Sequence, residues 1–379
     1  MSTLDGIRVL DLSRVLAGPF CTSMLADLGA DVVKVEPPGG DDTRHLGPFR
    51  DGTSVYFAML NRGKRGISLN LKDDGDRAEF LRLAERADVV VENFRPGVAD
   101  RLGVGAGEVL RRNPRAVYAS ISGFGQHGAL AGRPAYDLIV QAMSGLMAAT
   151  GEPDGEPTRV GESLADVIAG LYGAWAVCAA LVQRERTGAG QHLDIAMLDA
   201  MVSLQVTNAS LLAATGAAPG RVGNRHPVTT PFGAYRAADG QVVLAAANDR
   251  TFQAVLAMIE RPGLAGDPRL RTDADRTAHE PWLRGIIEDW TSTRKIEEIV
   301  GHAETHGVPA GPVQDLTAAF GAVHGRGVLG RLHDATLGEL ACLRQPVRFG
   351  AADPQPRRAA EVPRLGADRA QVLRDWLDA

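Results

Sequence analysis

The first half of the chain alternates short apolar runs with longer amphipathic stretches, and this alternation constrains the fold more than any other feature. Between the runs, stretches such as 76–87 place apolar side chains among charged ones at helical spacing. Strand–helix units repeated at this length predict a doubly wound α/β domain on a parallel sheet. The apolar runs predict strands over residues 7–12, 30–35, 88–91, 116–121 and 191–196.

The character of the sequence changes after residue 215. A loop rich in Gly, Pro and Arg covers residues 216–230, and the Asp239-Gly240 turn beyond it predicts a β-hairpin followed by three helices. The chain has 379 residues, which is long for one domain. We expect a large α/β domain over residues 1–215, a smaller α+β domain over 225–325, and a C-terminal segment, 330–379, that returns to the large domain.

Charge and composition argue against several classes of protein. The net charge is −5 with no basic stripe, so nucleic acid is not an expected partner. We expect no membrane partner either, because no uninterrupted apolar run approaches the ~20 residues that span a bilayer and no secretory signal is evident. Three widely separated cysteines and nine histidines without ligand spacing predict no disulfide framework and no metal site. A cytoplasmic protein fits these properties.

One acidic residue stands alone at the start of the most apolar predicted helix. From residue 164 to 181 the only ionisable side chains are Asp166, Tyr172 and Cys178. Ser163 and Asp166 have the spacing of a capping box, in which a hydroxyl and an acid stabilise the first turn. The N–H groups and dipole of that turn also favour an ionised carboxylate, which would be a ready nucleophile at neutral pH. Spacing alone leaves the structural and the catalytic interpretation open.

The segment Gly123-Phe-Gly125-Gln-His-Gly128 matches the dinucleotide-binding fingerprint but lacks its context. Residues 129–134, which follow it, are broken by Gly and Pro and do not open a helix. We therefore predict a backbone that approaches another group closely, and no nicotinamide site. Lys72, Arg95 and Arg101 are candidates for a phosphate-binding set, although a solvated surface explains the same residues.

Several segments, in order along residues 6–315, carry a resemblance to a known family. They are Gly6-Ile-Arg-Val-Leu-Asp-Leu-Ser13, Ala17-Gly-Pro19, Leu28-Gly-Ala-Asp-Val-Val-Lys-Val-Glu-Pro-Pro-Gly-Gly40, Asn61-Arg-Gly-Lys-Arg-Gly-Ile-Ser-Leu-Asn-Leu-Lys72, Val91-Glu-Asn-Phe94, Tyr118-Ala-Ser-Ile-Ser-Gly-Phe-Gly125 and Thr187-Gly-Ala-Gly-Gln191. The ordered set resembles the class III CoA-transferase family, the CaiB/BaiF superfamily that includes formyl-CoA transferases and α-methylacyl-CoA racemases.

The resemblance implies a Rossmann-like large domain, a small domain and two interlocked protomers in a homodimer. It places the catalytic aspartate of the family at Asp166. That carboxylate would attack an acyl-CoA thioester to give a mixed anhydride and then an aspartyl-CoA thioester, from which the acceptor acid collects CoA. A loop with Gly123 and Gly125 would supply backbone donors for the oxyanion. Coenzyme A is a substrate in this scheme, and no tightly bound cofactor is expected.

The main alternative within the family is a 2-methylacyl-CoA racemase. Racemases of the family carry a histidine where this chain has Tyr136. Racemisation needs a base that works near neutral pH, and tyrosine, with a pKa of about 10, is a poor one. Tyr136 therefore favours transfer. A non-catalytic CoA-binding protein and, more distantly, a dehydrogenase are alternatives from other classes.

The resemblance also implies substrate contacts. One family arginine after the second strand is replaced by Pro37 or Pro38, which puts that contact in doubt. The segment Gly223-Asn-Arg-His-Pro227 is typical of branches that use succinyl-CoA and small di- or hydroxycarboxylates. Within it, Arg225 and His226 would hold the distal carboxylate of the acceptor. Coenzyme A would contact Leu69, Lys72, Asn93, Phe94, Arg101 and Leu102.

Overall fold

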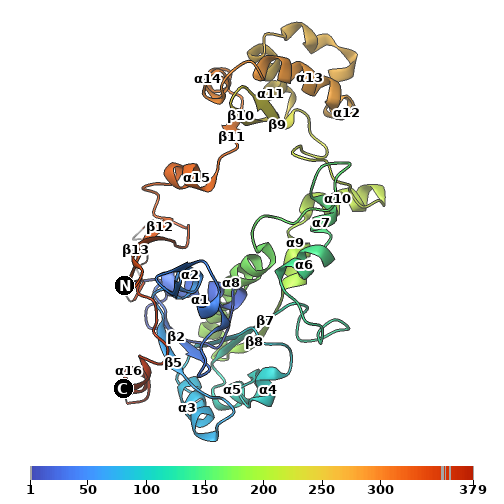
Figure 1. Ribbon diagram of the computed structural model, residues 1–379. Helices are drawn as coiled ribbons and strands as arrows, with labels where there is room; N and C mark the ends of the chain where they lie inside the picture. The colour runs from blue at the N-terminus through green and yellow to red at the C-terminus, as the bar shows by residue number, and fades with distance from the viewer. Residues whose placement is uncertain (1, 351–353, 355, 358–359, 379) are drawn as a thin grey trace. The chain divides into compact units, whose positions relative to one another are not determined.

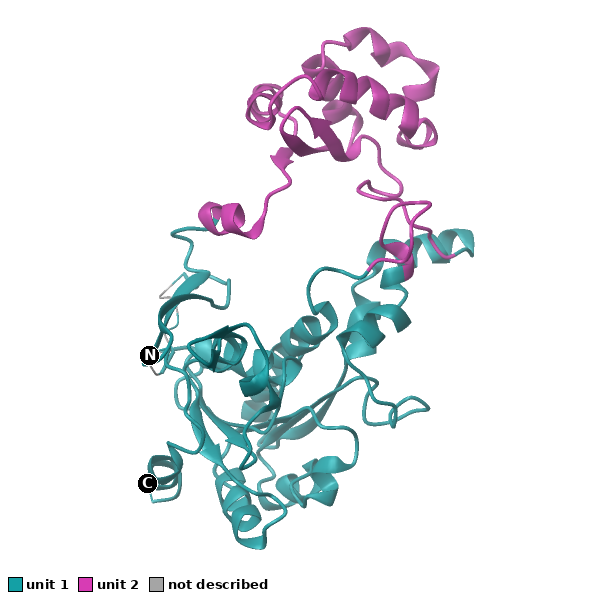
Figure 2. Ribbon diagram, in the orientation of Figure 1, with its two compact units in different colours: residues 1–147, 159–217, 323–379 teal, residues 148–158, 218–322 magenta. Residues whose placement is uncertain are grey.

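The computed structural model describes residues 2–350, 354, 356–357 and 360–378. The chain folds into two compact units (Figure 2). The first unit comprises residues 1–147, 159–217 and 323–379, and the second comprises 148–158 and 218–322. The second unit thus takes up a short segment, 148–158, that is distant in sequence from the predicted range 225–325.

A parallel sheet of six strands lies at the centre of the first unit (Figure 1). Its strand order is β5-β2-β1-β6-β7-β8, so the chain runs outward in both directions from the neighbouring strands β1 and β6. Such a reversal leaves a crevice at the carboxyl ends of these two strands. The strands are β1 Arg8–Asp11, β2 Asp31–Glu36, β5 Arg65–Ser68, β6 Val89–Glu92, β7 Val117–Ser122 and β8 Gln191–Ala196. The predicted parallel α/β fold is confirmed, while β5 was not predicted because Arg65 and Gly66 interrupt its apolar pattern.

Helices cover both faces of this sheet (Figure 1). On one face lie α1 (Ala17–Asp27) and α8 (Leu164–Thr187), and on the other lie α3 (Asp74–Ala84), α5 (Ala106–Arg112) and α16 (Arg369–Leu377). Neighbouring strand residues point to opposite faces, so Val89 and Val91 belong to one core and Val90 to the other. Burial on both faces explains why the strands are continuous apolar runs.

The contact between α8 and α1 depends on small residues. A Cβ atom at Gly170 would lie 2.5 Å from the carbonyl oxygen of Ala17, and one at Gly173 would lie 3.2 Å from Cys21 Sγ. Only glycine therefore permits this separation. Among the described helices α8 is long and apolar enough to cross a membrane, but here it packs on α1 and the sheet as a core helix does.

The predicted helix over residues 198–214 is wrong in one respect. The structure contains two helices there, α9 (Met197–Ser203) and α10 (Val206–Thr215), which meet at an angle of 70°. Gln205 lies at the break, where its side-chain amide donates a hydrogen bond of 2.8 Å to the carbonyl of Ser144. This tertiary bond fixes a bend that apolar periodicity does not reveal.

Three antiparallel strands, in the order β11-β10-β9, organise the second unit. The predicted hairpin forms β9 (Phe232–Ala237) and β10 (Gly240–Ala245). Apolar side chains of α11, α13 and α14 form one core with these strands.

The remaining elements are β3 Phe49–Arg50, β4 Thr53–Ser54, β11 Ala310–Pro312, β12 Leu329–Asp334, β13 Gly338–Leu343, α2 Val55–Asn61, α4 Val98–Arg101, α6 Asp137–Met143, α7 Leu146–Ala149, α11 Asp249–Met258, α12 Asp273–Ala278, α13 Glu280–Thr291, α14 Ile296–His306, α15 Leu316–Ala322 and the 3₁₀ helices Asp42–His45, Pro262–Gly266 and Pro268–Leu270.

Candidate active site

Asp166 lies where the first turns of α1 and α8 meet. Asp166 lies on the same face of α8 as Gly170, which follows one turn later. Gly170 contacts the backbone of Ala17. The backbone N–H of Ala17 donates a hydrogen bond to the Asp166 carboxylate. Ala17 is the first residue of α1, so its N–H has no partner within that helix. The carboxylate therefore accepts a donor that the fold leaves available.

The Asp166 carboxyl group titrates near neutrality. Burial and the charge of Asp137 raise its pKa to about 7, although the hydrogen bond from Ala17 acts in the opposite direction. The sequence predicted that a helix N-terminus would favour the ionised form, but desolvation outweighs that effect here. At neutral pH a large share of the carboxyl groups is still ionised, and among the described residues no cation pairs with Asp166 and weakens it as a nucleophile.

The predicted capping box between Ser163 and Asp166 does not form. Ser163 is the N-cap residue of α8, but its side chain makes no capping hydrogen bond. Asp137 takes this role, since its Oδ1 accepts a hydrogen bond of 2.7 Å from the backbone N–H of Ala165. Its Oδ2 accepts one of 2.7 Å from Gln141 Nε2. Asp137 thus caps α8 from another helix, and Asp166 is left free for chemistry.

Tyr56 is a member of the site that sequence reasoning missed. Burial raises its pKa to about 12, and the charges of Asp166, Glu162, Asp137 and Asp41 add to this shift. The phenol therefore keeps its proton at neutral pH and can donate a hydrogen bond beside the carboxylates. Its one sequence signal was its place in the first turn of α2, directly after the hydroxyl-capped start of that helix at Ser54.

The predicted oxyanion loop is fixed by packing. A Cβ atom at Gly123 would lie 2.2 Å from Ala135 Cβ, so the glycine serves a close approach, as the sequence predicts. Gly125 has a φ of +83°, and both oxygens of Asp194 accept hydrogen bonds from the backbone N–H of the next residue. In the single chain Tyr136 is 73% exposed at the start of α6. No contact between Asp166 and either glycine or Tyr136 is seen among the described residues, and their roles remain predictions.

A cavity of about 370 Å³ opens at the crevice between β1 and β6. Four of the six predicted CoA contacts line it, namely Leu69, Lys72, Phe94 and Leu102. Arg14, which the sequence did not indicate, also lines it, and its guanidinium lies 5.8 Å from the centre of the Phe94 ring. Pro37 lines it too. In the family that the sequence resembles, an arginine stands at the position of Pro37 or of the next residue, Pro38. The combination of two cations and an aromatic ring suits a nucleotide with phosphates.

The two other predicted CoA contacts do not line this cavity. Asn93 uses both ends of its side-chain amide on the backbone of Arg14, at 2.7 Å each. Arg101 lies at the end of α4, and its guanidinium is near the backbone of Gly97. Of the six predicted CoA contacts, four therefore line the cavity and two do not.

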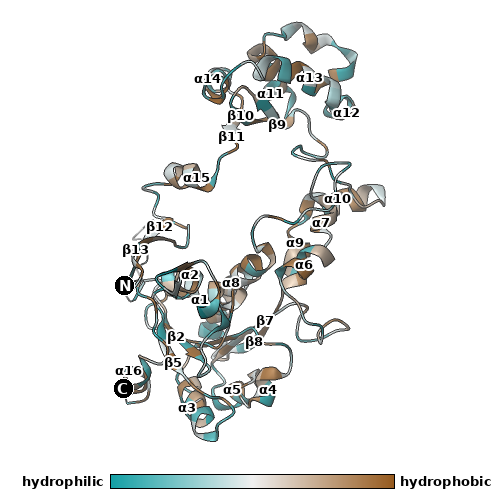
Figure 3. Ribbon diagram, in the orientation of Figure 1, coloured by the Kyte–Doolittle hydropathy of each residue, from teal (hydrophilic) through white to brown (hydrophobic). Residues whose placement is uncertain are grey.

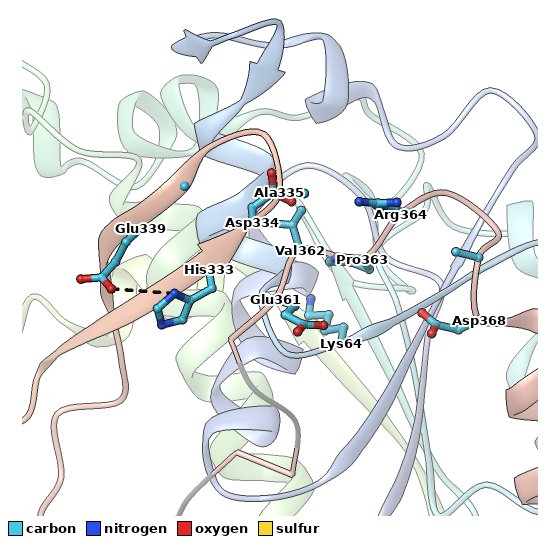
Figure 4. A pocket seen from close by; sticks show the side chains of 12 residues that line it. Lys64, His333, Asp334, Ala335, Glu339, Glu361, Val362, Pro363, Arg364 and Asp368 are labelled. Atoms are coloured by element: carbon cyan, nitrogen blue, oxygen red, sulfur yellow. Dashed lines mark ion pairs between the residues drawn. The ribbon is translucent and has the colours of Figure 1, made fainter.

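A cavity larger than this one lies elsewhere in the first unit. Its volume is about 560 Å³, and it is formed by the β12–β13 hairpin and the C-terminal segment (Figure 4). His333 and Glu339 face each other across part of it, with 3.8 Å between Nδ1 and Oε2. No predicted site residue lines it. Lys64 does, but its ammonium group points into the core and bonds Asp11. We therefore base the candidate active site on Asp166 and the 370 Å³ cavity, and not on this larger cavity.

Arg225 and His226 belong to the second unit. Arg225 pairs with Gly233 in an isolated β-bridge, and the His226 ring stacks on Phe232 with 5.3 Å between the centroids. Their proposed contact with an acceptor carboxylate remains a prediction. Within the described ranges, no group of three or more His, Cys, Asp or Glu residues is placed to hold a metal ion.

Comparison with known proteins shows the family to which the chain belongs. The model of CoA-transferase family III matches residues 4–369. The acetyl-CoA:oxalate CoA-transferase of Acetobacter aceti is 49% identical over 317 residues, which cover 83% of this chain and 82% of that protein. The succinyl-CoA:mesaconate CoA-transferase of Haloarcula hispanica is 42% identical over 386 residues, which cover 98% and 96%. The crystal structure of a CaiB/BaiF family protein from Brucella suis matches with a TM-score of 0.85 at 37% identity, covering 98% of this chain and 99% of that one.

Proposed function

This chain belongs to CoA-transferase family III, and from that premise we propose that it moves coenzyme A between carboxylic acids through covalent chemistry on Asp166. The observation that carries the proposal is the setting of Asp166. Its carboxylate is half-buried, receives the free N–H of Ala17, and has no cation beside it among the described residues. A carboxylate in that setting is more nucleophilic than one held in an ion pair.

The reaction balances in four steps. A carboxylate oxygen of Asp166 attacks the thioester carbonyl carbon, the C–S bond breaks, and CoA leaves as a thiolate from a mixed anhydride. The thiolate attacks the Asp166 acyl carbon and releases the donor acid, which leaves an aspartyl-CoA thioester. The acceptor carboxylate attacks this thioester and expels the thiolate, and the thiolate then attacks the acceptor acyl carbon and frees Asp166.

The neighbouring groups support these steps. The N–H of Gly18, the second residue of α1, is the proposed donor for the negative oxygen that forms at each addition, because Ala17 donates to Asp166, Pro19 has no N–H and Phe20 donates to Leu16. The neutral phenol of Tyr56 is a second donor beside the carboxylates. Asp137 keeps the first turn of α8 in place through Ala165. Water must be excluded because it would hydrolyse the anhydride, and the apolar residues around α8 serve that need.

We propose a small dicarboxylic acid as acceptor, with succinyl-CoA as a candidate donor. The relatives named for oxalate and mesaconate support a compact acid with two carboxylates. One carboxylate must reach Asp166, and the other needs a cationic partner. Arg225 is the proposed partner, with His226 beside it. Replacement of Arg225 by Ala should raise the KM for the acceptor more than the KM for the acyl-CoA.

The proposal also includes a homodimer. Large apolar side chains are exposed along α6, α8, α9 and α10, among them Trp175 at 67% and Val206 at 70%. Hydrophobic segments of these helices are brown in Figure 3. Many exposed large apolar side chains on neighbouring helices are typical of a surface covered by another protein. A second copy, interlocked with the first, is the proposed cover. Light scattering should give twice the chain mass, and Trp175→Glu should weaken the dimer.

Oxygen labelling tests the covalent steps directly. A panel of acids carrying ¹⁸O in their carboxylates would be incubated with succinyl-CoA and the purified protein. Attack by the acceptor must leave one ¹⁸O atom on Asp166, detectable by mass spectrometry of the peptide that contains it. Asp137 serves as the internal control because it should stay unlabelled.

Each outcome of this experiment is informative. A new acyl-CoA together with labelled Asp166 supports the mechanism and identifies the acceptor. A new acyl-CoA without label on Asp166 would rule out the covalent route. The same incubation in D₂O with a 2-methylacyl-CoA would reveal a racemase by deuterium at the α-carbon without any new thioester.

A further inference from the structure

The loop between β1 and α1, residues 13–16, connects the two halves of the proposed site. Arg14 lines the cavity that suits coenzyme A. Three residues later, Ala17 donates its N–H to Asp166. The conformation of this short loop therefore sets both a contact to the nucleotide and a contact to the nucleophile.

Side chains of Lys34, Asn93 and Asp41 hold three consecutive residues of this loop. The carbonyl of Ser13 accepts a hydrogen bond of 2.9 Å from Lys34 Nζ. Arg14 is held at both ends of its backbone, because Asn93 Oδ1 accepts from its N–H and Asn93 Nδ2 donates to its carbonyl, at 2.7 Å each. The N–H of Val15 donates to Asp41 Oδ1 at 3.3 Å. Such dense fixation is unusual for a connecting loop.

The fixation has a visible reason. Val15 has a φ of +65°, in the left-handed region that a β-branched residue strongly disfavours. Backbone strain of this kind persists only where the surroundings hold it, and it is concentrated at functional sites. Lys34 and Asp41 form a fully buried ion pair of 2.8 Å, so the groups that hold the loop are themselves rigidly placed.

We propose that Asn93, together with Asp41, is a positioning residue that holds the β1–α1 loop in its strained form, so that Arg14 reaches coenzyme A while Ala17 reaches Asp166. Asn93 does not itself contact coenzyme A in this assignment, because both ends of its amide bond the backbone of Arg14 and it does not line the cavity. The part of this proposal that concerns Ala17 and Asp166 rests on the proposed catalytic role of Asp166. The part that concerns Arg14 and coenzyme A depends only on the loop and the cavity that it lines.

The test compares the wild type with Asn93→Ala, Val15→Gly and the double variant. Without Asn93 the loop should relax away from a positive φ, and CoA affinity, measured by calorimetry, should fall about tenfold, the effect of one or two hydrogen bonds. Glycine adopts a positive φ without strain. Val15→Gly should therefore restore most of the affinity in the double variant, and that variant also carries the test should Asn93→Ala alone fail to fold.

The pH profile of kcat/KM gives a second readout that a general loss of structure would not produce. Asp166 is faced by Ala17 from α1 and Asp137 from α6, and Tyr56 of α2 lies within reach of its charge together with Glu162 and Asp41. Asn93→Ala removes the support of the Ala17 hydrogen bond. The rising limb of the profile should then move to higher pH by about half a unit, and the double variant should move it back.

A different pattern would overturn the assignment. Loss of CoA affinity that Val15→Gly does not restore, with an unchanged pH profile, would make Asn93 a direct CoA contact. Failure of the proposed function is recognised separately, since Asp166→Asn would then retain transfer while the affinity data for Asn93 and Val15 would still stand.

Discussion

Two buried acids of the first unit, Asp11 and Asp166, differ in what surrounds them. Asp11 is fully buried, yet the charges of Lys64 and Lys34 hold its pKa at about 2 against the effect of desolvation. Asp166 has another acid as its neighbour, and burial together with Asp137 raises its pKa to about 7. Desolvation acts in the same direction on both. The sign of the neighbouring charge therefore decides which acid stays ionised.

The comparison separates a structural acid from a reactive one. Lys64 bonds Asp11 at 2.9 Å and also bonds the Pro19 carbonyl, Thr22 Oγ1 and Asn61 Oδ1, so this cluster joins β1, α1 and α2. In the part of the chain that the structure describes, Asp166 has no cationic partner, and a buried carboxylate without one lowers stability. Perturbed acids of that kind are concentrated at functional sites.

The largest expected effect comes from the reactive acid. Asp166→Asn should lower CoA transfer by about 10⁴-fold or more, since it removes the nucleophile of every step. The Kd for coenzyme A should change little, because Asp166 does not line the 370 Å³ cavity. Steady-state kinetics and calorimetry on the same preparation check both statements. Transfer within tenfold of the wild type would contradict the distinction drawn between the two acids.

The structural acid should respond in stability. Lys64→Met leaves Asp11 buried without its nearest cation and should lower the free energy of unfolding by about 3–5 kcal/mol. Lys72→Met is the matched control, because Lys72 is exposed at the CoA cavity. It should change stability by less than about 0.5 kcal/mol and weaken CoA binding. Urea unfolding of both variants tests this, and equal stability would mean that the buried pair contributes nothing.

The two acids should also have opposite effects on how stability depends on pH. The folded state binds a proton on Asp166 up to about pH 7, whereas an unfolded aspartate loses it near 3.8. Stability from this group therefore falls as the pH rises from about 4 to 7, by about 2 kcal/mol for a carboxylate that keeps part of its solvation. Asp11, with a pKa of about 2, contributes stability above pH 4 that is lost as the pH falls towards 2.

Unfolding curves at pH 5 and pH 8 measure this difference. Asp166→Asn should be stabilised relative to the wild type at pH 8 and much less so at pH 5. Turnover of the wild type should rise through pH 7 as Asp166 ionises, and Asp137→Asn should move that rise to lower pH because a repelling charge is gone. A rise centred near pH 4 would show that burial does not control Asp166.

The sequence predicted the parts of this molecule that depend on local pattern. Apolar runs indicated five strands of the sheet, and four of the six CoA contacts implied by the resemblance line one cavity. The position of Asp166 in the first turn of an apolar helix made it a candidate, and the family resemblance assigned it the catalytic role, which stays a prediction. Patterns of this kind depend on residues that are close in sequence, so they can be recognised without a structure.

The interactions that the sequence did not reveal join residues distant in the chain. Asp137 caps α8 across 28 residues, and Asn93 holds the backbone of Arg14 across 79. The positive φ of Val15 has no signal either, since valine is a residue that avoids it. The raised pKa of Asp166 depends on burial and on Asp137, both products of tertiary packing. Spacing also predicted Ser163 as the side-chain cap of α8, whereas in the structure Asp137 makes the capping hydrogen bond.

That replacement of the cap allows a final test of small effects. Ser163→Ala should change the free energy of unfolding by less than about 0.5 kcal/mol, because no capping bond is lost. Asp137→Ala should cost about 1 kcal/mol or more, since it leaves the N–H of Ala165 without its acceptor. The comparison belongs at pH 5, where Asp166 is mostly protonated and the loss of repulsion from Asp137 does not offset the lost cap. A cost near 1 kcal/mol for Ser163→Ala would return the cap to Ser163 and contradict the assignment of the α8 cap to Asp137.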